Sequence, residues 1–190
     1  MKELLAPAHI FREYDIRGIA DKELTDEASR QIGRAFGTFL VESRKKKTAV
    51  GCDLRSSSAR MKAALIEGLV SAGIEGLDFG LIPTPLLYFG VTHFQQDAGI
   101  SITGSHNPPQ YNGFKFQLAS GPFYGADIRR LAERMQKEGF ATGKGRRETR
   151  DVTTPYLDAL KAQFHYSKKW KVVIDSGHGM AGLVAPRLFK

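Results

Sequence analysis

One segment combines a hydroxyl, an imidazole and an amide with a rigid turn: residues 103–113 read TGSHNPPQYNG. Ser105 follows a glycine, His106 and Asn107 can form hydrogen bonds beside it, and two prolines then stiffen the chain. Such a loop would hold a serine exposed with little chain entropy left to lose. The segment matches neither the G-x-S-x-G pattern of hydrolases nor the lysine pattern of nucleotide-binding loops. The residues alone therefore leave two readings of Ser105, a nucleophile or a polar turn in which it caps a helix.

Short strands and amphipathic helices alternate along the chain, which predicts an α/β fold with layers around a mixed sheet. The strand expected at 98–103 leads directly into the serine segment. After the segment, Phe114 and Phe116 alternate with Lys115, so Lys115 should project from the strand face opposite the core. Further strands are expected at 48–52 and 77–82.

The helices expected between these strands carry start signals and apolar stripes. Thr25 is predicted as the N-cap of the first helix, with Asp26 and Glu27 in the first turn, where acidic side chains suit the helix dipole. Residues 83–85, Pro-Thr-Pro, predict a rigid turn after the strand at 77–82. Two later helices are marked by Met61, Leu65 and Leu69, and by Ile128, Leu131 and Met135.

The last fifty residues change in character. Residues 141–153 are rich in glycine, threonine and charge, which predicts an interdomain linker. Thr154 is expected to cap a helix, and a strand is expected at 172–175. One strand and two helices cannot bury a core of their own. The sequence therefore predicts a first domain at 1–140 and the incomplete start of a second domain at 154–190, as part of a longer protein.

Composition excludes several classes of protein. The 190 residues contain one cysteine, Cys52, so an internal disulfide is impossible and a cytoplasmic location is expected. No apolar run is long enough for a membrane span, and the N-terminus does not resemble a secretory signal. The net charge of +8 arises largely from clusters at 44–47 and 144–150. Neither cluster is interleaved with aromatic residues, so solvated surface is expected rather than a nucleic-acid interface.

Five segments together resemble a known family. Residues 103–115, TGSHNPPQYNGFK, resemble the phosphoserine loop of the α-D-phosphohexomutase superfamily. Residues 11–18, FREYDIRG, resemble its N-terminal active-site motif and point to the phosphomannomutase/phosphoglucomutase branch. Residues 51–55 resemble its G-x-D-x-R motif and residues 83–85 a third motif. Residues 172–182 resemble the opening strand and turn of its second domain, so the resemblance covers essentially the whole chain.

This resemblance implies a reversible exchange between hexose 1-phosphates and hexose 6-phosphates, with glucose or mannose as the sugar. A phosphoserine donates its phosphoryl group to the free hydroxyl, and a bisphosphorylated sugar reorients and returns the other phosphate. The resemblance implies that Ser105 is nucleophile, phosphate carrier and, through its phosphate, a ligand of one Mg²⁺ ion. Phosphoryl transfer requires positioning and charge neutralisation above all, which suits this arrangement.

The resemblance also implies roles for two cations. Arg17 would bind substrate and offset the charge of the phosphoserine, because a guanidinium binds phosphate through a planar fork. The alternative for Arg17 is a surface ion pair with Asp15 or Glu13. Lys115 would shuttle a proton or stabilise phosphate and contact the substrate, and the alternative is an ordinary exposed strand lysine.

Other residues beside the serine receive lesser roles. His106 is expected either to act as an acid or base, since an imidazole titrates near neutrality, or only to hydrogen-bond the loop backbone. Tyr14 and Asn107 are expected to contact the substrate. Asp53 and Arg55 are expected to shape the loop rather than to act on the substrate.

Three loops of the family are absent from these 190 residues: the D-G-D-G-D-R metal loop, the G-E-x-S-G-H sugar loop and the C-terminal phosphate loop. We therefore expect the 190-residue chain alone to be inactive, with its natural partners the missing C-terminal domains. The alternative is a non-catalytic phosphate-binding or regulatory module that retains the serine loop. Weak self-association through 154–190 is also expected, because the edges of the strand predicted there would lack cover.

Overall fold

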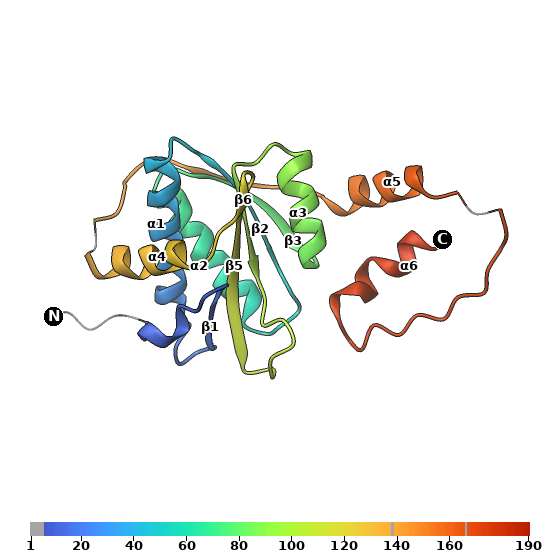
Figure 1. Ribbon diagram of the computed structural model, residues 1–190, viewed down its shortest axis with the longest axis horizontal. Helices are drawn as coiled ribbons and strands as arrows, with labels where there is room; N and C mark the ends of the chain where they lie inside the picture. Colours follow the sequence, from blue (N-terminus) through green and yellow to red (C-terminus); the bar gives the residue numbers. More distant parts are fainter. Residues whose placement is uncertain (1–5, 138, 166) are drawn as a thin grey trace.

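Seven strands form one mixed sheet in the computed structural model, which describes residues 6–137, 139–165 and 167–190 (Figure 1). The order is β1-β5-β4-β2-β3-β7, with β6 beside β5. Strands β4, β2, β3 and β7 are parallel, and β5 runs antiparallel to both β1 and β4. The strands are β1 (Ile16–Ile19), β2 (Lys47–Cys52), β3 (Glu75–Leu81), β4 (Ala98–Ile102), β5 (Tyr111–Leu118), β6 (Gly121–Pro122) and β7 (Arg146–Thr149).

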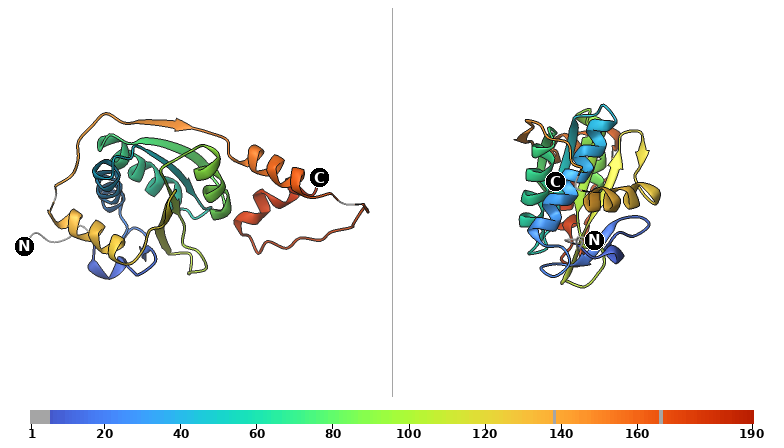
Figure 2. Two further views of the ribbon diagram at one scale, coloured as in Figure 1. Left: turned by 45° about the horizontal axis from the view of Figure 1, so that its top comes forward. Right: turned by 90° about the vertical axis from the view of Figure 1, so that its left-hand side faces the viewer.

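Helices cover both faces of the sheet, which confirms the predicted layered α/β fold (Figures 1 and 2). On one face, α1 (Asp26–Glu42), α2 (Ser58–Ser71) and α4 (Ala126–Lys137) pack on a core that includes Val50, Ile100 and Phe114. On the other face, α3 (Thr84–His93) and α5 (Thr153–Gln163) pack on Ala49 and Leu77. The alternation of Ala49 and Val50 between the two cores follows from the two-residue period of a strand. Short helices complete the chain: η1 (Ala8–Ile10), η2 (Met180–Leu183) and α6 (Ala185–Leu188).

The packing of α1 on α2 depends on two glycines at their crossing. A Cβ atom added to Gly33 would lie 2.2 Å from the carbonyl oxygen of Leu65. A Cβ atom added to Gly68 would lie 2.0 Å from the carbonyl oxygen of Arg30. The two helix backbones therefore touch, and this contact fixes how α2 meets the sheet behind the serine loop.

Of the two helix N-caps predicted from the sequence, one is confirmed and the other is wrong. The Thr25 side chain accepts a hydrogen bond of 3.1 Å from the N–H of Ala28, as predicted. The predicted cap at Thr154 is wrong, because α5 already begins at Thr153. The Asp151 carboxylate accepts hydrogen bonds from the N–H groups of Thr153 and Thr154, at 2.8 and 3.4 Å. Aspartate satisfies free N–H groups at a helix start as well as threonine does, so the true cap lies upstream.

Three other segments differ from the sequence-based expectation. Residues 83–85 do not only turn the chain but start α3, since proline is compatible with the first turn of a helix. The predicted linker at 141–153 contains the edge strand β7. The strand predicted at 172–175 is not formed: this stretch is irregular, and Val173 is 91% exposed. A strand needs a neighbour for its backbone hydrogen bonds, and none of the described strands lies beside these residues.

Candidate active site

The segment around Ser105 lies where the parallel strands end. β2, β3 and β4 run in the same direction, so the loops that follow them meet at one edge of the sheet. Two backbone hydrogen bonds join these loops: the N–H of Asp53 donates to Ile102 at 2.9 Å, and the N–H of Ile82 donates to Cys52 at 3.0 Å. The connection from β4 to β5, which carries Ser105, forms the lower tip of the molecule in Figure 1. This edge is a common location for ligand sites in α/β folds.

The guanidinium of Arg55 is hydrogen-bonded to the backbone of the serine loop. It donates hydrogen bonds to four backbone carbonyls: Ser105 at 3.1 Å, Asn107 at 2.6 Å, Pro108 at 2.7 Å and Tyr111 at 2.9 Å. A single planar group therefore fixes the backbone on both sides of the proline pair. The predicted loop-shaping role of Arg55 is confirmed by these contacts.

Asp53 completes this framework. Its carboxylate accepts hydrogen bonds from the backbone N–H groups of Arg55 at 3.0 Å and Gly104 at 3.1 Å, which confirms its predicted place beside the loop. It also pairs with the Arg55 side chain at 3.3 Å. A Cβ atom at Gly104 would lie 2.1 Å from the guanidinium carbon of Arg55, so any other residue here would displace the guanidinium from the loop. The residue before Ser105 is thus set by how closely Arg55 approaches the backbone.

Ser105 itself is exposed and has a left-handed backbone conformation, with φ at +54°. This region costs a residue other than glycine about 1–3 kcal/mol and persists only where the surroundings hold it. The N–H of Ser105 donates to the side-chain oxygen of Thr103 at 2.9 Å. Its own Oγ lies 3.3 Å from Nδ1 of the exposed His106. The loop therefore presents a serine hydroxyl to solvent with an imidazole next to it.

Behind the loop, a buried carboxylate joins two cations. One Asp15 oxygen, Oδ2, accepts hydrogen bonds from Arg17 at 2.5 Å and from Lys115 Nζ at 3.2 Å. The other arm of the Arg17 guanidinium donates to the carbonyl of Gly104, immediately before Ser105. Arg17 does pair with Asp15, but the pair is not on the surface, because the Arg17 side chain is only 4% exposed. The structure thus brings both predicted cations to one carboxylate: Arg17 contacts the serine loop directly, and Lys115 is joined to Arg17 through Asp15.

Lys115 projects from the sheet face that the sequence predicts. Phe114 and Phe116 are buried in the core with α1, whereas the Lys115 side chain is partly exposed on the other face. In the register of β4 and β5, Lys115 lies opposite Ser101. The Ser101 hydroxyl is 3.4 Å from that of Thr84, in the Pro-Thr-Pro segment. The third motif therefore borders the same face of the sheet.

Tyr14 and Asn107 differ in how the structure places them. Asn107 belongs to the serine loop, where its N–H donates to the carbonyl of Gly104 at 3.0 Å. Tyr14 is 72% exposed, and its ring stacks on Tyr124 with centroids 6.0 Å apart. Tyr124 lies outside the serine loop, so the predicted substrate contact of Tyr14 stays a prediction.

Sequence reasoning considered Asp15 only as a possible partner of Arg17 and missed its link to Lys115. One signal was available: Asp15 immediately precedes β1 and stands two residues before Arg17, the spacing at which extended residues share a face. The link to Lys115 depends on the pairing of β1 with β5, in which Arg17 lies opposite Gly113. That register joins positions about a hundred residues apart and is not readable from either segment alone.

Across residues 6–137, 139–165 and 167–190, no group of three or more His, Cys, Asp or Glu side chains is arranged to hold a metal ion. The residues that the structure describes therefore do not fit a complete Mg²⁺ site. No described helix is long and apolar enough to cross a membrane.

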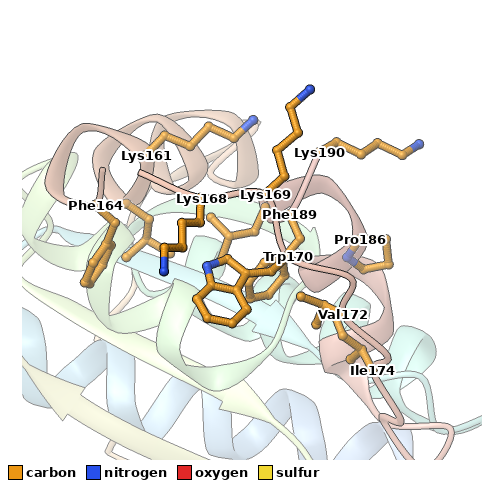
Figure 3. Close-up of a pocket in the computed structure, with 12 residues that line it drawn as sticks. Lys161, Phe164, Lys168, Lys169, Trp170, Val172, Ile174, Pro186, Phe189 and Lys190 are labelled. Carbon is orange, nitrogen blue, oxygen red and sulfur yellow. The ribbon is translucent and has the colours of Figure 1, made fainter. Parts of the chain in front are cut away.

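One cavity lies among residues 160–190, the C-terminal tail, and not at the serine loop (Figure 3). It has a volume of about 1200 Å³ and opens between α5, the irregular stretch after it and α6. Aromatic side chains and lysines line much of it, including Phe164, Trp170 and Lys169. Trp170 is itself 72% exposed, so this cavity is a loosely covered surface rather than an enclosed binding site.

Known proteins match both the sequence and the fold. The family model described as phosphoglucomutase/phosphomannomutase, alpha/beta/alpha domain I, matches residues 8–142. A phosphomannomutase/phosphoglucomutase of Pseudomonas aeruginosa is 40% identical over 97% of this chain and 40% of its own length. A phosphoglucomutase of Neisseria meningitidis serogroup B is 37% identical over 95% of this chain and 40% of its own length. A probable phosphoglucosamine mutase of Pyrococcus horikoshii is 36% identical over 92% and 39%.

A solved structure agrees closely. The crystal structure of a phosphoglucomutase/phosphomannomutase family protein from Burkholderia thailandensis superimposes with a TM-score of 0.92 at 38% identity. It covers 97% of this chain and 42% of its own. This chain spans about 40% of the length of the curated relatives it matches. The match over residues 8–142, most of the chain, confirms the resemblance seen in its motifs: the chain belongs to the phosphoglucomutase/phosphomannomutase family.

Proposed function

We propose that this chain supplies the phosphoryl-carrying domain of a phosphohexomutase, which interconverts hexose 1-phosphates and hexose 6-phosphates of glucose or mannose. The observation that carries the proposal is the exposed Ser105 hydroxyl on a loop fixed by Arg55, with the buried Arg17 directly beneath it. Relatives named as phosphomannomutase/phosphoglucomutase support the same activity. The single cysteine, Cys52, is buried and free, which suits a reducing cytoplasm.

The proposed reaction has two phosphoryl transfers. In the first, the bond between phosphorus and Ser105 Oγ breaks and a bond forms from phosphorus to the free hydroxyl oxygen of a hexose monophosphate. A base takes the proton of that hydroxyl, and Ser105 Oγ, the leaving group, receives a proton. The product is a hexose bisphosphate. After this sugar reorients, its other phosphate returns to Ser105 and releases the isomeric monophosphate. The serine is regenerated as phosphoserine, so one enzyme-bound phosphoryl group is conserved in each cycle.

Two kinds of side chain would assist these transfers. Arg17 and Lys115 lie beside the loop as cations and would offset the charge on the transferring phosphoryl group. His106 and Lys115 are the candidate proton carriers, and His106 Nδ1 is already 3.3 Å from Ser105 Oγ. Asn107 and Tyr14 would contact the sugar phosphate.

The family implies a Mg²⁺ ion, for which the described part of this chain does not supply a complete site. The phosphate on Ser105 would give the ion one oxygen ligand, and the remaining ligands would come from outside the 190 residues. Removing one preorganised electrostatic group already slows a reaction by roughly 10²–10³-fold. We therefore propose that the 190-residue chain has no measurable turnover by itself.

The proposal is tested in a protein that spans the full length of the relatives. With glucose 1-phosphate as substrate and glucose 1,6-bisphosphate as activator, Ser105→Ala is expected to lower turnover at least about 1000-fold, because the nucleophile is removed. Alanine keeps a Cβ atom, so the strain at φ +54° is unchanged and stability should change by less than about 1 kcal/mol. Ser120→Ala, at another exposed serine, is the matched control.

The two readings of the serine loop give different results in this assay. Loss of turnover with an unchanged thermal melt would support the phosphohexomutase. Retention of most activity by Ser105→Ala would remove Ser105 from the mechanism. Binding of hexose phosphate without turnover by the unaltered full-length protein would favour the non-catalytic phosphate-binding module instead.

A further inference from the structure

Asp15 is the only carboxylate, among the ion pairs of the described residues, that contacts both cations behind the serine loop. Its side chain is 12% exposed, and its partners Arg17 and Lys115 are 4% and 32% exposed. Removing a guanidinium from water is costly unless a counter-charge lies in contact with it. Asp15 supplies that charge for Arg17 and uses the same oxygen for Lys115.

The contacts of Arg17 extend this arrangement to the reacting residue. One arm of its guanidinium is held by Asp15 and the other donates to the carbonyl of Gly104. Gly104 immediately precedes Ser105, so Arg17 holds the peptide group that leads into the left-handed Ser105. Asp15 thus orients Arg17, and Arg17 in turn supports the backbone of Ser105.

The charges of this cluster do not match those of a phosphoserine. Arg17 and Lys115 carry two positive charges, and Asp15 cancels one of them. Nearby, Asp53 and Arg55 neutralise each other as a pair, and His106 Nδ1 lies 3.3 Å from Ser105 Oγ. A phosphoserine at neutral pH carries a charge of about −1.5 to −2. Without Asp15, the two cations would match this charge. With Asp15 present, they only partly offset it.

Incomplete neutralisation of the phosphoserine charge should affect the rate of phosphoryl transfer. An interaction that stabilises the phosphorylated ground state as much as the transition state does not speed the chemical step. Two fully available cations would hold a phosphoserine tightly and lower its tendency to donate. A carboxylate that competes for the same cations weakens this hold on the ground state.

We propose that Asp15 is a positioning residue that competes with the phosphoryl group on Ser105 for Arg17 and Lys115. In the unphosphorylated protein it keeps both cations oriented toward the loop. In the phosphorylated protein it limits how tightly they hold the phosphoryl group, which stays transferable. The inference rests on the proposed function, because it takes Ser105 as the phosphate carrier.

The test measures the energetic coupling between Asp15 and a phosphate at position 105. Phosphoserine is placed at 105 of the 190-residue chain by genetic-code expansion, so no enzymatic activity is needed. The thermal midpoint is measured with and without the phosphate, in the wild-type sequence and in Asp15→Asn. Phosphorylation is expected to raise the midpoint more in Asp15→Asn than in wild type, by about 2–4 °C, because the repulsion between the two anions is gone. A purely structural Asp15 would lower both midpoints of the variant equally.

Two further variants complete the design. Glu42→Gln removes a surface carboxylate paired with Arg134 and should leave the effect of phosphorylation at its wild-type value. Lys115→Met tests the competition from the cation side, and is informative even if Asp15→Asn does not fold. In Lys115→Met, phosphorylation should raise the thermal midpoint less than it does in wild type, by about 2–4 °C.

An effect of phosphorylation that is the same in wild type and Asp15→Asn would overturn the inference. If Asp15→Asn does not fold, an effect unchanged in Lys115→Met would do the same. Because the phosphoserine is incorporated during translation, a failure of the proposed mutase activity would leave the coupling measurable. Loss of the coupling would remove the role of Asp15 without touching the assignment of Ser105.

Discussion

Ser105 keeps a left-handed backbone because neighbouring side chains hold the loop, not because its own sequence favours that conformation. Arg55 contributes most of these contacts, through hydrogen bonds to four carbonyls of residues 105–111. Asp53 fixes the N–H of Gly104 on the other side. The exposed hydroxyl is therefore positioned by residues that follow β2, the neighbouring strand.

Replacing Arg55 by lysine should loosen this loop although the charge is kept. A lysine ammonium has three donors on a flexible stem and cannot reach all four carbonyls in one plane. We expect Arg55→Lys to lower the free energy of unfolding by roughly 1–3 kcal/mol. Amide exchange in residues 104–111 should become faster, as measured by hydrogen–deuterium exchange.

Arg60→Lys is the control for this variant, because Arg60 pairs with surface carboxylates of Asp21 and Asp26. It should leave exchange in the serine loop unchanged. Unchanged exchange in Arg55→Lys as well would show that the loop is held by other contacts.

At the residue scale, the sequence predicted what is local. The loop residues Ser105, His106 and Asn107 follow one another in the chain, and their proximity needs no fold. The face on which Lys115 lies follows from its alternation with phenylalanines. The bridge from Lys115 to Asp15 required the register of two strands, which depends on packing over the whole sheet.

At the scale of elements, β7 is the clearest departure from prediction. Its residues, Arg146–Thr149, are all exposed and show no apolar alternation, so the pattern that marks a strand is absent. Its position depends on pairing with β3 and on the ion pair of Arg147 with Asp78, at 2.5 Å. Asp78 also pairs with the buried Lys62 of α2, at 2.6 Å. A charge cluster, buried at Asp78 and Lys62 and half-exposed at Arg147, thus joins α2, β3 and the edge strand β7.

The carboxylate of Asp78 should make the free energy of unfolding depend on pH. Burial raises its pKa, but hydrogen bonds from Lys62, from the N–H of Gly80 and from Arg147 outweigh this, so the pKa lies below its usual value. A carboxyl group with a lowered pKa in the folded state stabilises the fold above its unfolded pKa, near 4. That stabilisation is lost as the pH falls through the folded pKa.

Asp78→Asn is therefore expected to cost roughly 3–5 kcal/mol at neutral pH, because Lys62 remains buried without a counter-charge. The difference from wild type should narrow as the pH falls below about 4, in urea unfolding measured across the pH range. Glu75→Gln, which breaks an exposed pair on the same strand, should cost much less. A difference that stays constant with pH would contradict the assignment.

The start of helix α3 shows that one sequence motif can be compatible with two structures. Two prolines in three residues predicted a turn, and the structure places a helix of ten residues from Thr84. Proline at the start of a helix costs no hydrogen bond, so the same residues are compatible with both outcomes. Apolar contacts of α3 with β2 and β3 decide between them.

At the scale of the whole molecule, the chain divides into a packed sheet domain and a more open tail. Residues 164–190 return past α5 but expose several large apolar side chains, among them Phe164, Trp170 and Val173 (Figure 2). The domain boundaries at 140 and 154 stay a prediction. The strand expected at 172–175 needed neighbouring strands, which its own sequence could not supply.

The tail, residues 164–190, should show fast amide hydrogen exchange and weak self-association. In the 190-residue chain we expect faster amide exchange at 172–174 than in β4, because no described strand pairs with these residues. Their exposed apolar side chains should also cause weak self-association. Hydrogen exchange at two protein concentrations measures both effects. Protection equal to that of β4 and independent of concentration would contradict this view of the tail.

Locating the phosphoryl group on the protein tests most directly whether Ser105 is the phosphate carrier. The protein that spans the full length of its relatives is incubated with glucose 1,6-bisphosphate, and its peptides are mapped by mass spectrometry. We predict one phosphoryl group on Ser105, which excess hexose monophosphate removes as hexose bisphosphate forms. Turnover with Ser105 unmodified, or with the phosphoryl group on another residue, would contradict the claim that Ser105 is the phosphate carrier.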